Sequence, residues 1–169
     1  MSVLELFISP GKYISGYDNI SKLGIEINKL GNKPMLLIDK NIEKIVEIGI
    51  KSIKSFGEVE ITYFNGECTF DETNRITKLM IEKGCDVIVG FGGGKTMDTA
   101  KASGYDAKVK IATVPTIAAT CAAWASHSAM YTPEGIAHSY YSIYKNADLV
   151  FMDKKITSEA PLRYIISGM

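Results

Sequence analysis

Apolar, β-rich runs alternate with segments of helical periodicity along this chain, and no other feature of the sequence constrains the fold as strongly. Strands separated by single helices are typical of βαβ units, in which the strands lie parallel and helices cover the sheet. The runs that we interpret as strands are 35–38, 59–64, 87–91, 109–114 and 149–152. The sequence therefore predicts an α/β fold with a parallel sheet and flanking helices.

The segments between these runs carry apolar residues at helical spacing. A capping box at Thr69–Glu72 predicts the start of the third helix, and Gly84 predicts its end. The fourth helix is expected from the glycines at 92–94 to about Gly104. The inward faces of the first two helices are predicted to consist of Ile20, Leu23, Ile27 and Leu30, and of Ile42, Ile45, Val46, Gly49 and Ile53.

The pattern changes after residue 114. Segments 126–131 and 136–142 flank Thr132-Pro133-Glu134-Gly135, which suits a type I turn, so we expect a β-hairpin attached to the otherwise parallel sheet. Residues 160–169 look like the beginning of a helix that the chain does not finish. Because no linker interrupts the sequence, we expect one α/β domain over residues 1–169.

Composition excludes several functional classes. The 19 Lys and Arg residues balance 19 Asp and Glu residues, so the chain has no basic field for nucleic acid or an anionic membrane. Residues 111–133 contain no charged side chain, but their Thr, Ser, Pro and His127 argue against a membrane span. Three widely spaced cysteines and the lack of a basic leader indicate a reducing, cytoplasmic location.

The sharpest chemical motif is Gly92-Gly93-Gly94 between a buried strand and a helix. Glycines at such a turn let a ligand approach main-chain N–H groups, and the helix N-terminus favours an anion, so we predict that phosphate binds here. The alternative is a tight turn without a ligand. Neither a P-loop nor the G-x-G-x-x-G fingerprint fits, because Val89, Lys95 and Met97 stand where glycines are required.

Other candidate residues follow the ends of neighbouring strands, where open parallel sheets bind ligands. Lys95 could contact a phosphate or be a solvated lysine in the first helical turn. Asp39 could accept both hydroxyls of an adenosine ribose, which favours NAD over NADP, or could cap the next helix. Small residues and hydroxyls from Pro115 to Trp124 leave room for a ligand or form a closely packed helix.

Long, ordered motifs resemble the iron-containing alcohol dehydrogenase superfamily and, within it, the glycerol dehydrogenase branch. They are GGGKTMDTAK at 92–101, PTIA at 115–118, Tyr131 and KNADLV at 145–150, and the match spans nearly the whole chain. The resemblance implies a Rossmann-like nucleotide-binding domain, with the family's C-terminal helical, metal-binding domain absent. It implies the oxidation of a CH–OH group with NAD, NADP being less favoured.

The resemblance also implies roles for individual residues. Gly93, Gly94, Lys95 and Thr96 would hold the pyrophosphate and Asp39 the ribose, while Asp98 matches the aspartate of the same family motif. Cys121 would lie near the substrate, where the glycerol branch has an aspartate; Thr120–Trp124 looks more like the branch that includes hydroxycarboxylate dehydrogenases. The positions that would lie beside the cofactor are Thr116, Ala119, Ala125, His127 and Tyr131.

The family uses zinc or iron, and none of its metal ligands is expected within these residues. We therefore expect the chain alone to bind dinucleotide without turning over an alcohol or polyol, and to self-associate as a homo-oligomer. Two alternatives stay open at this point: a fragment of a 2-oxo acid reductase of the hydroxycarboxylate dehydrogenase type, and a nucleotide-binding module without catalysis.

Overall fold

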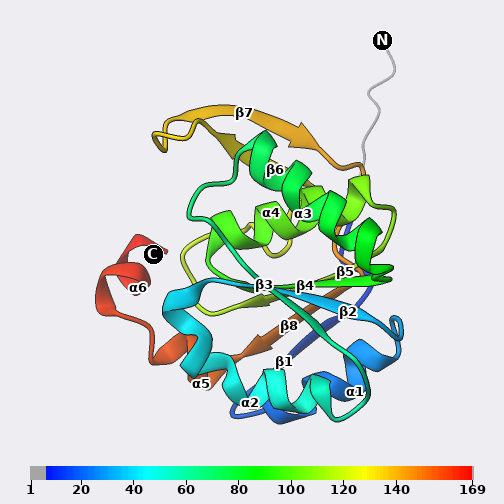
Figure 1. Ribbon diagram of the computed structural model, residues 1–169. Coiled ribbons are helices and arrows are strands. Elements are labelled where there is room, and N and C mark those ends of the chain that lie inside the picture. Colours follow the sequence, from blue (N-terminus) through cyan, green and yellow to red (C-terminus); the bar gives the residue numbers. More distant parts are fainter. Residues whose placement is uncertain (1–6, 169) are drawn as a thin grey trace.

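A six-stranded parallel sheet forms the middle layer of the computed structural model, which describes residues 7–168 (Figure 1). Across the sheet the strands follow the order β1-β8-β5-β4-β2-β3. The α/β prediction is confirmed, and each of the five predicted strands is present, with ends shifted by one residue or left unchanged. The strands are β1 (Tyr13–Gly16), β2 (Pro34–Ile38), β3 (Glu60–Tyr63), β4 (Val87–Gly92), β5 (Lys110–Pro115) and β8 (Leu149–Asp153).

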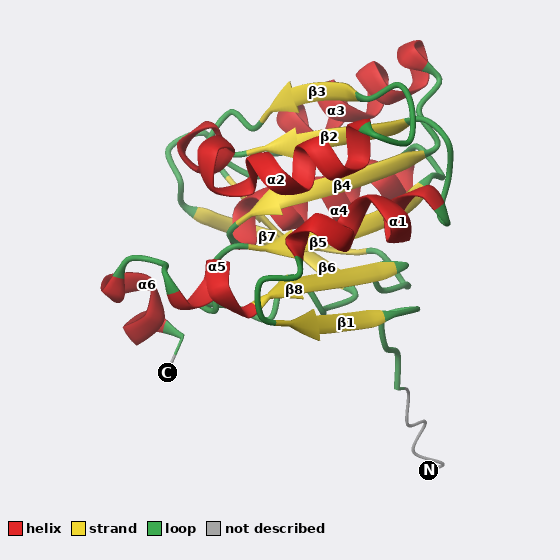
Figure 2. Ribbon diagram, turned by 90° about the horizontal axis from the view of Figure 1, so that it is seen from below, coloured by secondary structure: helices red, strands yellow, loops and turns green. Residues whose placement is uncertain are grey.

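Helices cover both faces of the sheet (Figures 1 and 2). The helices α1, α2 and α5 lie on one face, and α3 and α4 lie on the other. No helix among residues 7–168 is both long and apolar enough to cross a bilayer. The helical segments are η1 (Ile20–Lys22), α1 (Leu23–Asn28), η2 (Lys40–Ile42), α2 (Glu43–Lys54), α3 (Phe70–Lys83), α4 (Gly94–Asp106), α5 (Lys154–Ser158) and α6 (Leu162–Ser167).

Two apolar cores lie on the two faces of the sheet, and β4 contributes to both. Val89 and Phe91 pack into the core beneath α1 and α2, whereas Ile88 packs into the core beneath α3 and α4. Gly90 lets α4 approach the strand closely, because a Cβ there would lie 2.7 Å from the Cβ of Ala100. Burial on both faces explains why β4 reads as a continuous apolar run.

The helix boundaries follow the local signals with two differences. Thr69 caps α3 by accepting a hydrogen bond from the Glu72 N–H, and Gly84 ends the helix in the left-handed conformation at φ +64°. The Glu72 carboxylate, however, pairs with Arg75 and does not return to the backbone of Thr69, so only half of the capping box forms. Ile45, expected on the inward face of α2, is 51% exposed.

The hairpin is present but is not attached to the main sheet. Strands β6 (His127–Tyr131) and β7 (Ala137–Ser142) pair only with each other and lie over the α3 and α4 layer (Figure 1). The Gly135 N–H donates to the Thr132 carbonyl across the predicted turn, at 2.9 Å. The expectation of an attached hairpin is wrong because α4 separates the two sheets and binds β6 through its own polar side chains.

Asp153 joins the two ends of the fold. Its buried carboxylate accepts hydrogen bonds from the N–H groups of Asp18 at 3.1 Å, Ile20 at 2.8 Å and Lys155 at 2.9 Å. It therefore caps α5 and orients the segment that follows β1 at the same time.

Candidate functional site

The strand order places two predicted motifs on either side of the point where the chain reverses its direction across the sheet. From β2 the chain moves outward to β3 and then returns to place β4 on the other side of β2. Asp39 follows β2 and the glycine turn follows β4, and Ile38 pairs in register with Phe91. In open parallel sheets ligands bind in the crevice at such a switch point, outside the carboxyl ends of the strands.

The glycine turn allows neighbouring residues to lie close to its backbone. Gly92 has φ +156°, and a Cβ there would lie 2.7 Å from Thr96 Oγ1. A Cβ on Gly93 would lie 3.0 Å from the Ile117 side chain, and one on Gly94 would lie 2.9 Å from that of Thr120. Gly93 and Gly94 thus let the loop after β5 fold over the start of α4, and Gly92 makes room for the side chain of Thr96.

The first turn of α4 has no side-chain cap. Gly93 is the N-cap residue and provides no side-chain hydrogen-bond acceptor, and the Met97 N–H donates to the Gly93 carbonyl at 3.1 Å. Helix starts leave several N–H groups without intrahelical partners and carry a partial positive charge. The backbone geometry here is therefore suited to hold an anion.

A cleft of about 330 Å³ opens beside this helix start. Of the predicted site residues, the cleft brings together Gly94, Lys95, Asp98, Cys121, His127 and Tyr131. Thr120 and Ala122 also line it and belong to the small-residue segment 115–124 for which a ligand was expected, whereas Ala129 and Tyr140 were not predicted. Ala129 and Tyr140 belong to the hairpin, whose position over α4 depends on tertiary packing and has no local sequence signal.

The remaining predicted residues do not line the cleft. Asp39 is half-buried and accepts a hydrogen bond from the Asn41 N–H at 2.9 Å, so it acts as a helix cap. Thr96 and Thr116 are buried, and the Thr116 N–H donates to the Gly92 carbonyl at 3.1 Å. Gly93, Ala119 and Ala125 are partly buried in the turn and the loop that follows β5.

Asp98, which lines the cleft, forms a buried ion pair with Lys101. Lys101, 1% exposed, places Nζ 2.9 Å from Asp98 Oδ1 and donates to the carbonyl oxygens of Ala125 and His127. Asp98 Oδ2 accepts from the Ala129 N–H at 3.2 Å. Burial raises the pKa of Asp98, although the Lys101 ammonium opposes this shift. The pair fixes the start of the hairpin against α4.

Lys95 is also paired. Its Nζ lies 2.6 Å and 2.7 Å from the two carboxylate oxygens of Glu67, and 4.6 Å from the ring centroid of Tyr131. Glu67 was not a predicted site residue, because a contact across 28 residues between separate elements has no signature in the sequence.

The cysteines differ in accessibility. Cys121 is exposed in the cleft, whereas Cys68 and Cys85 are buried. Burial raises the pKa of the Cys68 thiol to about 11, which keeps it protonated and unreactive at neutral pH.

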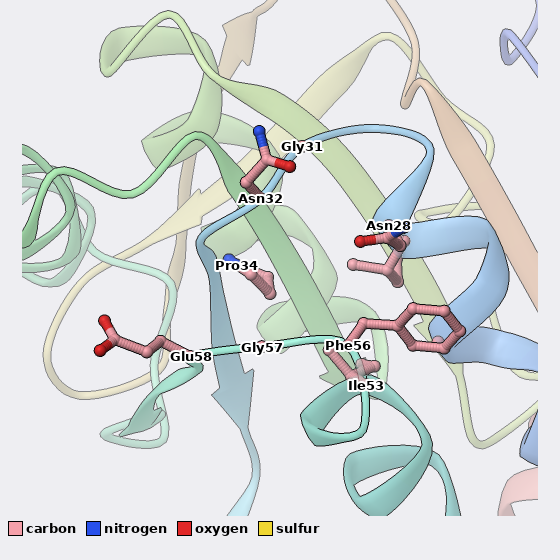
Figure 3. Close-up of a pocket in the computed structure, with 10 residues that line it drawn as sticks. Asn28, Gly31, Asn32, Pro34, Ile53, Phe56, Gly57 and Glu58 are labelled. Atoms are coloured by element: carbon pink, nitrogen blue, oxygen red, sulfur yellow. The ribbon is translucent and has the colours of Figure 1, made fainter.

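A second hollow, between the end of α1 and the segment that joins α2 to β3, is too small for an organic ligand. Figure 3 shows Asn28, Pro34 and Phe56 around it, at the amino end of β2. Its volume of about 10 Å³ is close to that of a single water site. Within residues 7–168, no group of three His, Cys, Asp or Glu side chains is placed to hold a metal ion.

Comparison with known proteins identifies the family. Residues 10–154 match the family described as iron-containing alcohol dehydrogenase. The chain is 39% identical over 164 residues to a glycerol dehydrogenase from Thermotoga maritima, covering 96% of this chain and 44% of that protein. It is 38% identical over 109 residues to hydroxycarboxylate dehydrogenase A of Escherichia coli, covering 63% of this chain and 29% of that protein.

The solved structure of a glycerol dehydrogenase from Schizosaccharomyces pombe superposes with a TM-score of 0.89 at 32% identity. The match covers 99% of this chain and 43% of that chain. The present chain thus spans less than half the length of the relatives that it matches. Its sequence motifs, sheet order and comparisons agree, and the chain belongs to the iron-containing alcohol dehydrogenase family.

Proposed function

We propose that these residues form the dinucleotide-binding part of an NAD-dependent, metal-dependent oxidoreductase that acts on an alcohol or polyol. The observation that carries this proposal is the position of the uncapped glycine turn and Asp39 on either side of the β2–β4 switch point, beside an open cleft. Family membership supports the reaction class, and the names of the relatives support a polyol or small hydroxy compound as substrate.

The backbone fits the diphosphate bridge of a dinucleotide. We assign the N–H groups of Gly93 and Gly94 to the phosphates, because side chains at these positions would fill the space against the loop after β5. Thr96 lies beneath the turn and supports it. Lys95 is assigned to the same phosphates. To contact them, its ammonium must give up part or all of its pairing with the Glu67 carboxylate.

Asp39 is assigned to the adenosine ribose, and its negative charge would repel a 2′-phosphate, so we propose NAD rather than NADP. The proposed contacts to the rest of the cofactor come from the loop after β5 and from the hairpin. They involve Asp98, Thr116, Ala119, Ala125, His127 and Tyr131.

When bound, the nicotinamide would accept a hydride from the alcohol carbon. The chain's own contribution is to hold the dinucleotide along the carboxyl edge of the sheet and to enclose one side of the cleft with the hairpin. Residues 7–168 contain no group of side chains that could coordinate zinc or iron, so we assign no metal ligand to them. We propose that the chain by itself does not turn over substrate.

The substrate-proximal position is occupied by Cys121, which is exposed in the cleft. A thiol there is compatible with a polyol and also with the second candidate, a 2-oxo acid reduced in the reverse direction. The likeness to hydroxycarboxylate dehydrogenase A favours this second candidate. A third candidate is a nucleotide-binding module without catalysis, in which Cys121 would face no substrate.

Binding is tested by titration of the purified chain with NADH, followed by quenching of the fluorescence of Trp124, the single tryptophan. We expect saturable quenching with NADH and weaker quenching with NADPH. Gly94→Val, which places a branched side chain in the turn, should weaken binding at least about tenfold, since it obstructs the amides and crowds Thr120. Equal affinity in the variant would contradict the assigned site.

Activity is tested separately with glycerol, 1,2-diols and 2-oxo acids, each with zinc or iron added. Turnover by the chain alone would overturn the proposal that it is inactive, and the preferred substrate would decide between the first two candidates.

We also propose self-association, because Leu162 and Ile166 on α6 are 69% and 60% exposed. A monomer by light scattering at high concentration would refute it.

A further inference from the structure

The ammonium group of Lys95 is neutralised by a carboxylate from a distant part of the chain. Both oxygens of Glu67 lie within 2.7 Å of Lys95 Nζ, and the Tyr131 ring lies beneath the same ammonium. The side chains of Lys95 and Glu67 are 38% and 29% exposed, so the pair lies within reach of a ligand in the cleft. Two of the three ammonium hydrogens are thereby used within the protein.

Glu67 is held in this position by its neighbours. It lies in the segment between β3 and α3, and the carbonyl of the next residue, Cys68, accepts a hydrogen bond from the Tyr131 N–H at 2.8 Å. On the hairpin turn, a Cβ on Gly135 would lie 3.2 Å from Glu67 Oε1. The carboxylate is thus fixed between the hairpin and the start of α4.

This pairing decides the charge that the cleft presents. Among the described residues that line the cleft, Lys95 is the one lysine or arginine, and the one carboxylate, Asp98, is paired with Lys101. An anion that enters therefore meets the amides of the helix start but no free cation. To gain the Lys95 ammonium it must compete with Glu67.

We propose that Glu67 sets the charge preference of the cleft by competing with incoming anions for the Lys95 ammonium. This inference deepens the proposed function and rests on it for the identity of the ligand, which is the diphosphate of the dinucleotide. Glu67 weakens the binding of phosphate groups and of substrates that carry a carboxylate, and leaves the binding of uncharged hydroxylated groups unaffected.

The test uses Glu67→Gln, which keeps the shape of the side chain and removes its charge. NADH and inorganic pyrophosphate should bind this variant about two- to fivefold more tightly, the range expected when a half-exposed ion pair no longer competes. Glu134→Gln is the matched control, because it removes the same charge from an exposed position on the hairpin turn. Adding Lys95→Met to Glu67→Gln should abolish the gain.

Unchanged or weaker anion binding in folded Glu67→Gln, or an equal gain in Glu134→Gln, would overturn the proposal. A second readout does not need the dinucleotide: labelling of Lys95 by pyridoxal 5′-phosphate and borohydride, measured by peptide mass. Labelling should rise severalfold in Glu67→Gln and in the second variant Glu67→Ala, and unchanged labelling refutes the competition. If labelling rises in Glu67→Gln as expected but neither protein binds NADH, the proposed function fails while this inference stands.

Discussion

Replacing Lys101 with methionine should destabilise the chain by about 3–5 kcal/mol, the usual cost of removing one partner from a buried ion pair. Lys101 is 1% exposed, and its ammonium contacts the Asp98 carboxylate and two backbone carbonyls. Methionine keeps much of the aliphatic packing but leaves these three acceptors without their donor. With an m-value of about 2 kcal/mol/M, the urea midpoint should fall by about 2 M.

Urea unfolding followed by circular dichroism measures this change. Lys110→Met is the matched control, because it breaks a Lys–Asp pair whose lysine is 55% exposed and should cost at most about 1 kcal/mol. The double variant Asp98→Asn/Lys101→Met should be more stable than the sum of the single variants indicates, since the uncompensated charge is gone. Equal effects of Lys101→Met and Lys110→Met would refute the reasoning.

Three further predictions concern stability and thiol chemistry. Asp153→Ala should cost about 2 kcal/mol in thermal melts, because it removes caps from two helix starts; an unchanged melting temperature contradicts this. Because burial raises the folded-state pKa of Asp98, its contribution to stability is largest at low pH and is lost as pH rises through that value. Asp98→Asn should lack this loss in urea titrations at stepped pH, and parallel curves would disprove it. At pH 8, 5,5′-dithiobis(2-nitrobenzoate) should react rapidly with Cys121 and not with buried Cys68, and Cys121→Ser should remove the fast phase.

The central strands were predictable because strands that are buried on both faces consist of continuous apolar residues. Leu36 and Leu37 are fully buried on opposite faces of β2, and β4 behaves in the same way. Strand β1 was missed because it is short and lies at the sheet edge, where Tyr13 is 47% exposed and no apolar run is needed. Local pattern thus located the interior strands and the edge strand β3, but not the edge strand β1.

The candidate site was predictable where its chemistry resides in the backbone. The glycine turn and Asp39 could be placed because strand ends and helix starts follow from local pattern and from the general rule for parallel sheets. The pairing of Lys95 with Glu67 and the burial of Lys101 were not predictable. Both depend on the hairpin packing over α4, which a single sequence does not encode in any local spacing.

The pairing of β1 with β8 delays completion of the sheet during synthesis. Tyr13 pairs with Val150, so β1 leaves the ribosome long before β8, the strand with which it pairs. At synthesis rates of roughly 5–20 residues per second, it waits on the order of 10 s. During that interval β1 and the edge of β5 that later pairs with β8 both lack their partner strand, so chaperones or early self-association can act on them.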